Sequence, residues 1–312
     1  MAKKKVVVAL GHSALGVTLP EQMNAVKTAA KSIADLVENG CQVVISHSNG
    51  PQVGMIHKAM NEFGKLHGDY TNAPMSVCSA MSQGYIGYDL QNAIHEELLR
   101  RGIFKTVVTV ITQVAVDPYD EAFFHPTKTI GRILTEEEAE QEKKKGNYVV
   151  PVEGGYQRII ASPEPKEIIE IDAIRSLVEA GHIVIACGGG GIPVLRQETH
   201  LKGASAVIEK DLASSVLADS LHADELIILS GIEHLVLHEG TEHEIILKNL
   251  SVSEAKEYVD KQVFPQETTG AKLSASIAFV GENKERRAII TELTKALEGH
   301  EGKTGTIITS IS

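Results

Sequence analysis

Aromatic residues are scarce in this chain and tryptophan is missing. Only 4% of the 312 residues are Phe, Trp or Tyr, and none of them is Trp. Within a hydrophobic fraction of 43%, the core must therefore consist mainly of Val, Ile, Leu and Ala. This composition argues against a β-sandwich and against an aromatic platform for binding carbohydrates. A chain of this length can bury the core of one large α/β domain.

Cysteine is also scarce. Cys41, Cys78 and Cys187 lie far apart and form no Cys-x-x-Cys pair. This spacing speaks against a disulfide framework, and it speaks equally against a zinc ribbon. We expect these three residues to be buried, reduced thiols.

A metal-ligand set is missing as well. His234, His238 and His243 are close in sequence, but they fall in an expected hairpin whose side chains alternate between its two faces. No clear set of carboxylates or thiols accompanies them. Solvated surface histidines explain this pattern better than a metal ion does. The sequence therefore indicates no metal-ligating residues.

Positive charge is in short supply. Lys and Arg number 30 against 41 Asp and Glu, which gives a formal net charge of −11. Such a chain repels phosphate backbones and anionic lipid at long range, so we expect neither nucleic acid nor a membrane as a partner. A phosphate-bearing ligand must then be captured by a few local cations and backbone N–H groups.

Long apolar runs do not occur. No uninterrupted apolar stretch approaches the roughly 18 residues that a membrane span requires. The apolar run at 6–10 follows Lys3, Lys4 and Lys5, but it is too short for the core of a signal peptide. We therefore expect a cytoplasmic protein.

The apolar residues that are present predict an α/β fold. The run at 6–10 ends at Gly11, which is typical of a strand buried on both faces. Residues 21–38 place apolar side chains at helical spacing between Pro20 and Gly40, and a second buried strand follows at 43–45. Because the crossover of such a unit is right-handed, the two strands should be parallel.

The rest of the chain continues this pattern with one interruption. Further strands are expected at 106–112, 183–186, 226–229, 288–290 and 306–309, and a hairpin at 235–237 and 245–247. Between 117 and 163 the pattern weakens, with several prolines and a charged run at 136–145. Buried-strand patterning then resumes without a change of composition. We therefore interpret 117–163 as an inserted excursion or lid rather than a linker.

Three glycine-rich turns follow expected strands, at 11–16, 48–54 and 188–191. In open parallel sheets, ligands bind outside the carboxyl ends of strands, where glycines let the backbone approach and helix N-termini offer free N–H groups. In the second turn Asn49 suits a helix N-cap, so that Gly50 could present an N–H group to an anion. Each turn alone could be an ordinary tight turn. Three in one sheet favour a phosphate-binding edge.

Cations accompany these turns. Lys128, Arg158, Lys210 and Lys272 stand beside turn residues or expected helix starts. This placement suits pairing with phosphate. Any one of these side chains, taken alone, could instead be an ordinary surface cation.

Several motifs together resemble carbamate kinase over nearly the whole chain. They are Asn-Gly-Pro-Gln-Val-Gly at 49–54, Met-Ser-Gln-Gly-Tyr-Ile-Gly-Tyr at 81–88, Pro-Thr-Lys at 126–128, Cys-Gly-Gly-Gly-Gly-Ile-Pro-Val at 187–194 and Lys-Asp-Leu-Ala-Ser at 210–214. The resemblance implies the amino acid kinase fold, an α/β three-layer sandwich with a mainly parallel eight-stranded central sheet. It implies a single domain at 1–312 with a protruding subdomain near 117–163, and a homodimer.

The resemblance also implies a reaction and a set of roles. The reaction is reversible phosphoryl transfer between ADP and carbamoyl phosphate, giving ATP and carbamate, with Mg2+ bound to the nucleotide. Catalytic residues would be Lys128, Lys210, Asp211 and Lys272, with Asp211 orienting the lysines. The carbamoyl phosphate side would comprise Gly11, His12, Ser13, Ser48, Asn49, Gly50 and Arg158, and the nucleotide side Lys210, Ser230, Gly231, Gly270 and Lys272.

The chain departs from the family pattern at both phosphate turns. Where the family has Gly-Gly-Asn, residues 11–13 of this chain are Gly-His-Ser. Where the family has His-Gly-Asn-Gly, residues 47–50 are His-Ser-Asn-Gly. A non-glycine residue at His12 would cost roughly 1 to 2 kcal/mol if the turn kept a left-handed conformation. Several lid charges are missing at 150–158, and Glu267 adds a carboxylate near the expected nucleotide side.

Two classes of function therefore stay open. The first is an enzyme, either carbamate kinase or a relative with an altered acceptor and weak activity. The second is a kinase-fold protein with little turnover, which binds nucleotide or acts as a scaffolding partner. The retained lysines favour the enzyme, whereas the altered turns and lid favour the second class.

Overall fold

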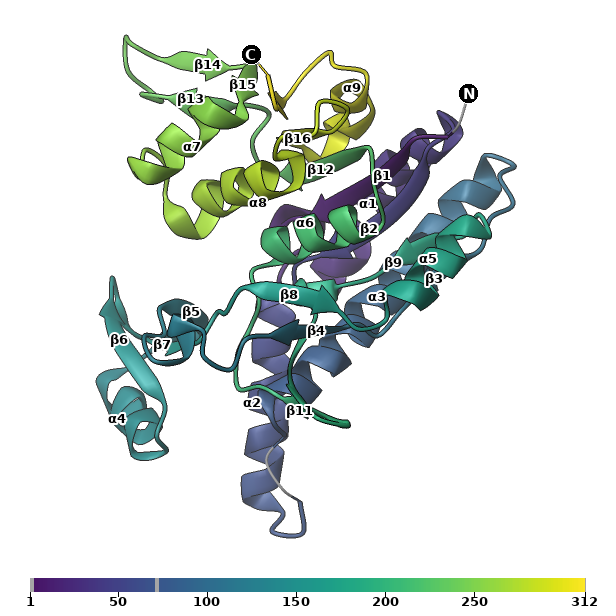
Figure 1. Cartoon of the computed structure of the whole chain (residues 1–312). Helices are drawn as coiled ribbons and strands as arrows, with labels where there is room; N and C mark the ends of the chain where they lie inside the picture. Colours follow the sequence, from purple (N-terminus) through teal and green to yellow (C-terminus); the bar gives the residue numbers. More distant parts are fainter. Residues whose placement is uncertain (1–2, 71–72, 312) are drawn as a thin grey trace.

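The computed structural model describes residues 3–70 and 73–311, apart from the side chain of Ser13. Its centre is an eight-stranded sheet in which β16 and β17 form the antiparallel pair and the other neighbours run parallel. In spatial order the strands are β15 (Asn249–Ser251), β17 (Thr306–Thr309), β16 (Arg287–Glu292), β12 (Glu225–Ser230), β1 (Lys5–Leu10), β2 (Gln42–His47), β9 (Ile183–Ile185) and β3 (Val107–Thr109). The expected α/β fold with a mainly parallel sheet is confirmed (Figure 1).

Helices cover both faces of this sheet. Alternate side chains of β1 show why: Val6 and Val8 join one buried core, whereas Val7 and Ala9 join the other. One face carries α1 (Leu19–Glu38), α3 (Met75–Arg100) and α9 (Ala296–His300); the other carries α5 (Ile171–Glu179), α6 (Lys210–Ser220), α7 (Val252–Asp260) and α8 (Ala271–Val280). The molecule is thus a three-layer sandwich.

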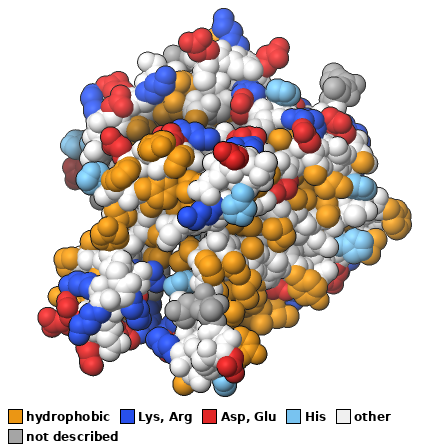
Figure 2. Space-filling view, turned by 60° about the horizontal axis from the view of Figure 1, so that its bottom comes forward, with side chains coloured by type: hydrophobic (Ala, Val, Ile, Leu, Met, Phe, Trp, Pro, Cys, Tyr) orange, Lys and Arg blue, Asp and Glu red, His pale blue; other side chains and the backbone are white. Residues whose placement is uncertain are grey.

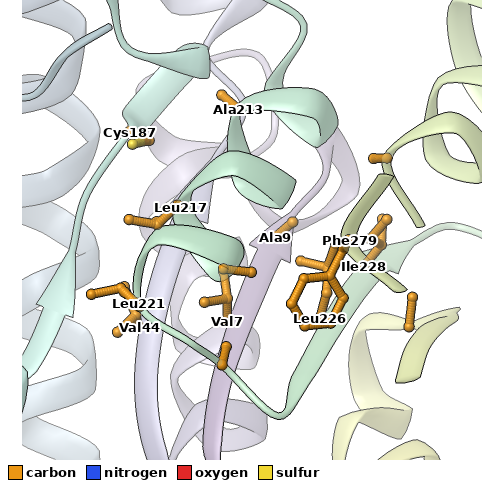
Figure 3. Close-up of a cluster of buried hydrophobic side chains, with 14 of the residues drawn as sticks. Val7, Ala9, Val44, Cys187, Ala213, Leu217, Leu221, Leu226, Ile228 and Phe279 are labelled. Carbon is orange, nitrogen blue, oxygen red and sulfur yellow. The ribbon is translucent and has the colours of Figure 1, made fainter. Parts of the chain in front are cut away.

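The helix α6 illustrates how the second core is built. Ala213, Leu217 and Leu221 recur every four residues and turn one stripe toward the sheet, where Figure 3 shows Leu221 beside Val44. The side chains of Leu217 and Leu221 are at most 1% exposed. Burying one leucine contributes about 1.5 to 3 kcal/mol, so this stripe holds α6 firmly against the sheet.

Local expectations from the apolar pattern are largely confirmed. β1 and β2 are parallel neighbours, and β13 (Leu235–Leu237) with β14 (Ile245–Leu247) forms the expected antiparallel hairpin. α1 begins at Leu19, slightly earlier than expected, because Thr18 and Glu21 form a capping box. The expected strand at 106–112 is shorter, since only Val107–Thr109 pairs with β9.

A second sheet, which the sequence did not predict, lies beside the first. It contains β11 (His200–Gly203), β10 (Ile192–Gln197), β4 (Gln113–Val116) and β8 (Pro165–Ile168) in that order. Short helical turns connect the main elements: η1 (His12–Ala14), η2 (Glu121–Phe123), η3 (Gly188–Gly190), the π-helical η4 (Gln266–Gly270) and η5 (Leu293–Lys295). In the described ranges, no helix is both long enough and apolar enough to cross a membrane.

A separate three-stranded sheet protrudes from the sandwich at the lower left of Figure 1. Its strands are β5 (Lys128–Leu134), β7 (Gly155–Ile160) and β6 (Tyr148–Val152), and α4 (Glu136–Lys144) covers it. It packs on α2 (Gly50–Leu66), where a Cβ at Gly54 would lie 3.7 Å from Gly131 Cα. Val53, Ile56 and Ile160 form a small shared core. This unit falls within 117–163.

Candidate active site

Four parallel strands end side by side at one edge of the central sheet. β12 pairs with β1, β1 with β2, and β2 with β9. At or just beyond their carboxyl ends stand Ser230, which is the last residue of β12, and then Gly11, Ser48 and the 187–191 turn, respectively. This is the edge at which open parallel sheets bind ligands. The three glycine-rich turns predicted from the sequence therefore come together.

Gly11 lets β1 and β12 approach each other closely. Its N–H donates to the Leu229 carbonyl at 3.0 Å, and a Cβ at this position would lie only 2.9 Å from that oxygen. Ser230 follows at once, with its Cα 3.7 Å from the same hypothetical Cβ. Gly231 is exposed beside it. The expected nucleotide-side residues at 230–231 thus lie next to the expected substrate-side Gly11.

His12 adopts a relaxed conformation. It begins η1, and it is not among the described non-glycine residues with positive φ. The strain expected for a left-handed turn therefore does not arise. The His12 ring instead leans over the start of α2: its Nδ1 lies 3.2 Å from Ser48 Oγ, and a Cβ at Gly50 would be 3.1 Å from its Cε1. The side chain of Ser13 lies outside the described part of the chain.

The N-terminus of α2 is left open at this edge. Asn49 occupies the N-cap position, as expected, but its side chain does not cap the helix. Asn49 Nδ2 donates to Ser82 Oγ at 2.8 Å instead. A Cβ at Gly189 would clash with the same amide. The first N–H groups of α2, from Gly50 onward, are therefore not satisfied by a side chain and are suited to an anion.

His47 packs against this turn and forms a hydrogen bond with its backbone. Its side chain is fully buried, and burial lowers its pKa to about 4. The neutral ring donates from Nδ1 to the Ser48 carbonyl at 2.9 Å. Its Nε2 lies so close to Gly188 that a Cβ there would clash with it. His47 thus positions the backbone that carries Ser48.

Gln83 joins the 188–191 turn to Thr112, which follows β3, although sequence reasoning assigned it no role. From the middle of α3, its Nε2 donates to the carbonyls of Thr112 at 3.1 Å and Gly188 at 3.0 Å, and its Oε1 accepts from Thr112 N–H at 2.9 Å. Thr112 Oγ1 accepts from the Cys187 N–H, which helps to hold Cys187 at φ 53°. The only signal in the sequence was the motif at 81–88.

A buried carboxylate gathers two lysines. Asp211, 1% exposed, lies in the first turn of α6, and its two oxygens pair with Lys210 Nζ and, at 3.1 Å, with Lys272 Nζ from α8. Burial opposes ionisation of Asp211, but the lysines outweigh it and hold the pKa of the carboxyl below its usual value. Each ammonium has three donors, so both keep donors for a phosphate.

Lys128 reaches the same region from the protruding sheet. It begins β5, and its Nζ lies 2.6 Å from Glu209 Oε2, at the N-cap of α6. This ion pair connects the protruding sheet to the residue that precedes Lys210.

The charges of these groups all affect the ionisation of His12. Partial burial lowers the pKa of His12, and so do Lys210, Lys272 and Lys128, while Glu209 opposes them. The ring is therefore neutral at neutral pH. The catalytic lysines expected from the sequence thus lie around the turn that carries His12.

Arg158 is not brought to this edge. It lies on β7, where its Nε is 3.5 Å from Glu142 Oε2 and its guanidinium donates to Asn147 Oδ1 at 3.0 Å. Gly270 ends η4 just before Lys272, and its N–H donates to the Pro265 carbonyl at 2.9 Å. The two residues therefore differ: Gly270 leads into the lysine cluster, whereas Arg158 is held within the protruding sheet.

Comparison with known proteins identifies relatives along the whole chain. The model of the amino acid kinase family matches residues 4–292. The "Carbamate kinase-like protein YqeA" of Escherichia coli is 50% identical over 98% of this chain and 99% of its own length. The carbamate kinase of Pyrococcus horikoshii is 45% identical over 98% of this chain and 99% of its own length.

A solved structure agrees with these relatives. The carbamate kinase of Giardia lamblia, solved bound to AMP-PNP, superposes with a TM-score of 0.91 at 35% identity, covering 99% of each chain. The resemblance inferred from the motifs is confirmed, and the chain belongs to the amino acid kinase family.

Proposed function

We propose that this member of the amino acid kinase family catalyses reversible phosphoryl transfer between ADP and carbamoyl phosphate, giving ATP and carbamate. One observation carries the proposal: Asp211 holds Lys210 and Lys272 near His12, whose ring lies over the open N-terminus of α2 at the carboxyl edge of the sheet. The relatives named carbamate kinase support the choice of substrate.

Such a transfer needs positioning and neutralisation of charge rather than covalent help. Lys210 and Lys272 would neutralise the oxygens of the moving phosphoryl group, while Asp211 keeps both ammonium groups aimed at it. The N–H groups at Gly50 would hold carbamoyl phosphate. Gly11 would keep the end of β1 close against β12, so that the substrate-side and nucleotide-side turns lie next to each other.

Further roles follow from the same resemblance. Ser230, Gly231 and Gly270 would line the nucleotide side, and Mg2+ would enter as the complex of the nucleotide, where it would neutralise phosphate charge. Lys128 would reach the phosphoryl group from the subdomain at 117–163 once phosphate competes with its Glu209 partner. Arg158 would join the substrate only if its contacts within the protruding sheet opened.

A second candidate keeps the fold but little of the turnover. It is a carbamate-kinase-like protein with an altered acceptor, acting mainly as a nucleotide-binding or scaffolding partner. The contact between His12 and Ser48 favours it, because these side chains occupy the place where a carbamoyl phosphate cradle is expected. ADP binding without ATP formation would support this candidate.

The test of the main proposal is ATP formation from ADP, Mg2+ and carbamoyl phosphate by the pure protein. We expect activity that Lys210→Ala abolishes, since the moving charge loses a cation. Lys27→Ala, which changes an exposed lysine on α1, should leave the rate unchanged. A parent protein that forms no ATP, yet binds ADP, would contradict the proposed reaction.

We also propose a cytoplasmic homodimer, as the family resemblance implies. α3 leaves Val77, Met81 and Tyr88 at 47%, 43% and 69% exposure, at spacings that place them along one helix face. On the face drawn in Figure 2, hydrophobic side chains lie in several groups across the middle of the molecule. Light scattering at micromolar concentration should give the mass of two chains; a monomeric mass would refute the dimer.

A further inference from the structure

His12 and His47 both lie at the phosphate-side turns, but their surroundings differ. His47 is buried, and its Nδ1 is committed to the Ser48 carbonyl. His12 is only partly buried, and within the described ranges only its Nδ1 has a hydrogen-bond partner, the Ser48 hydroxyl. Nε2 of His12 is therefore the imidazole nitrogen that a bound ligand can reach.

This nitrogen stands at the amino end of α2. A Cβ at Gly50 would lie 3.7 Å from Nε2 of His12, so the ring edge touches the first residue of the helix. Helix N-termini attract phosphate, and no side chain caps this one. A phosphoryl group held at the start of α2 would therefore contact Nε2.

The His12 imidazole is also in the protonation state that a phosphoryl acceptor requires, with one nitrogen unprotonated. Partial burial and the charge of Lys210 lower the pKa of His12, so at neutral pH one ring nitrogen keeps its lone pair. When Nδ1–H donates to Ser48 Oγ, the lone pair is on Nε2. The lysines that lower this pKa are the same groups that would attract a phosphoryl dianion.

We propose that Nε2 of His12 accepts the phosphoryl group of carbamoyl phosphate, a step that rests on the proposed function because that function brings the donor here. The Nε2 lone pair forms the N–P bond as the P–O bond to the carbamoyl group breaks. The electron pair of the broken bond leaves with carbamate. Nδ1 keeps its proton, held by Ser48 Oγ, so no other proton moves. With ATP as donor, ADP is the leaving group.

Phosphorylated His12 would compete with ADP for the phosphoryl group. Its added negative charge would pair with Lys210 and Lys272, and it would fill the start of α2 until ADP or water removes it. A histidine that only fills the turn leaves no such covalent mark. The two possibilities therefore differ in one observable product.

The experiment uses the full-length protein, incubated with carbamoyl phosphate without ADP and, separately, with ATP and Mg2+. The protein is then denatured in alkali and its intact mass is measured. We expect the added mass of one phosphoryl group, removed by acid as phosphohistidine requires, and mapped by fragmentation to the peptide that contains His12. His12→Gln should lose it. His95→Gln, the same change at an exposed histidine on α3, should keep it.

Any of three results overturns the inference. The parent carries no acid-labile phosphoryl group, the group maps to another peptide, or His12→Gln retains it. Fragment mapping of the parent decides the matter even if the variant fails to fold. ATP formation is measured on the same preparation. ATP formation without the mark refutes the phosphohistidine alone; the mark without ATP formation refutes turnover alone; the absence of both refutes both.

Discussion

Two buried carboxylates lie at opposite edges of the central sheet. Asp211 lies at the edge where β1, β2 and β12 end, whereas Glu225 lies where β12 begins. Each is 1% exposed, and each is surrounded by cations. The same electrostatic arrangement thus occurs twice in one molecule.

We call the cluster at Glu225 the closed cluster because both of its carboxylate oxygens join elements of the fold to one another, although the Lys4 side chain is itself 54% exposed. Glu225 Oε1 accepts from Lys4 and Arg287 at 2.8 Å, and its Oε2 contacts His300 Nδ1 at 2.7 Å. Arg287 also donates to the His300 carbonyl, and the other ring nitrogen of His300 lies 3.6 Å from Cys41 Sγ. Burial opposes ionisation, but the hydrogen bonds from His300 and Lys4 and the charge of Arg287 lower the pKa of Glu225 to about 2.

The cluster at Asp211 is open by comparison. Lys210 and Lys272 each use one donor on the carboxylate and keep others, and the uncapped start of α2 lies nearby. At Glu225 the cations mainly join strands and helices to one another. The difference teaches that a buried ion cluster indicates a ligand site only when its cations retain donors beside an accessible turn.

The largest expected effect tests the closed cluster. Glu225→Gln should lower the free energy of unfolding by about 3 to 5 kcal/mol, because it leaves Arg287 and His300 without a counter-charge. Urea denaturation measures this loss. ADP binding by the folded variant should stay close to that of the parent. Glu239→Gln, at an exposed carboxylate, is the matched control. Equal stability of both variants would mean that Glu225 does not hold this edge together.

The next effect tests the open cluster. Lys210→Ala and Lys272→Ala should each weaken binding of ADP with Mg2+ about ten- to a hundredfold, since each removes a charge-assisted contact of about 1.5 to 3 kcal/mol. Titration calorimetry gives the affinities, and urea denaturation should show a smaller loss than for Glu225→Gln. If both variants bind ADP as the parent does, the nucleotide site has been placed wrongly.

A smaller effect concerns the turn beside the open cluster. His12→Gly combined with Ser13→Asn should raise kcat for ATP formation about tenfold, which corresponds to about 1.4 kcal/mol, because the ring no longer covers the start of α2. The family pattern supplies the choice of Asn at position 13. A parent kcat already in the ordinary range of about 10 to 1,000 per second would show that His12 is compatible with catalysis.

The smallest expected effect is a pH dependence of stability at the closed cluster. Hydrogen bonds to Cys41 and Glu225 raise the pKa of His300 from 6.5 to about 9. Because protonated His300 is favoured in the folded state, it stabilises the fold fully below pH 6.5. This contribution of about 1 kcal/mol is lost as pH rises from 6.5 to 9. Urea denaturation across this range should show the decline in the parent and a flatter profile in His300→Gln. Identical profiles would exclude His300 as its source.

Glu225, the carboxylate that pairs with His300, makes stability depend on pH in a second range, on the acid side. Because the pKa of Glu225 is lowered from 4.5 to about 2, its stabilisation is present above pH 4.5 and is lost as pH falls toward 2. Glu225→Gln should remove that part of the acid sensitivity.

Much of the fold could be predicted because it depends on local pattern. The strand expected at 306–309 is β17, with the same bounds, and the hairpin of β13 and β14 was expected from two short apolar runs. The glycine turns were predictable because each follows a buried strand directly. Such features need only neighbouring residues.

Contacts between distant segments could not be predicted in this way. Gln83 is one of several polar residues on α3, and nothing in its neighbourhood reveals that Thr112 and Gly188 meet it. Cys41 is buried, as expected, but its contact with His300 joins residues far apart in sequence. The strain considered for His12 was conditional on a left-handed turn, which the 3₁₀ turn η1 replaces.

The position of β1 in the sheet has a consequence for synthesis on the ribosome. One side of β1 pairs with β2, which emerges soon after it, but the other side pairs Val6 with Glu225 and continues to Leu229. Until that late strand has been translated, β1 remains an open edge, which a nascent chain must keep from associating with other chains. The Gly11 N–H reaches its partner, the Leu229 carbonyl, only at the same stage. Catalytic competence therefore arrives late in translation, after most of the chain has been made.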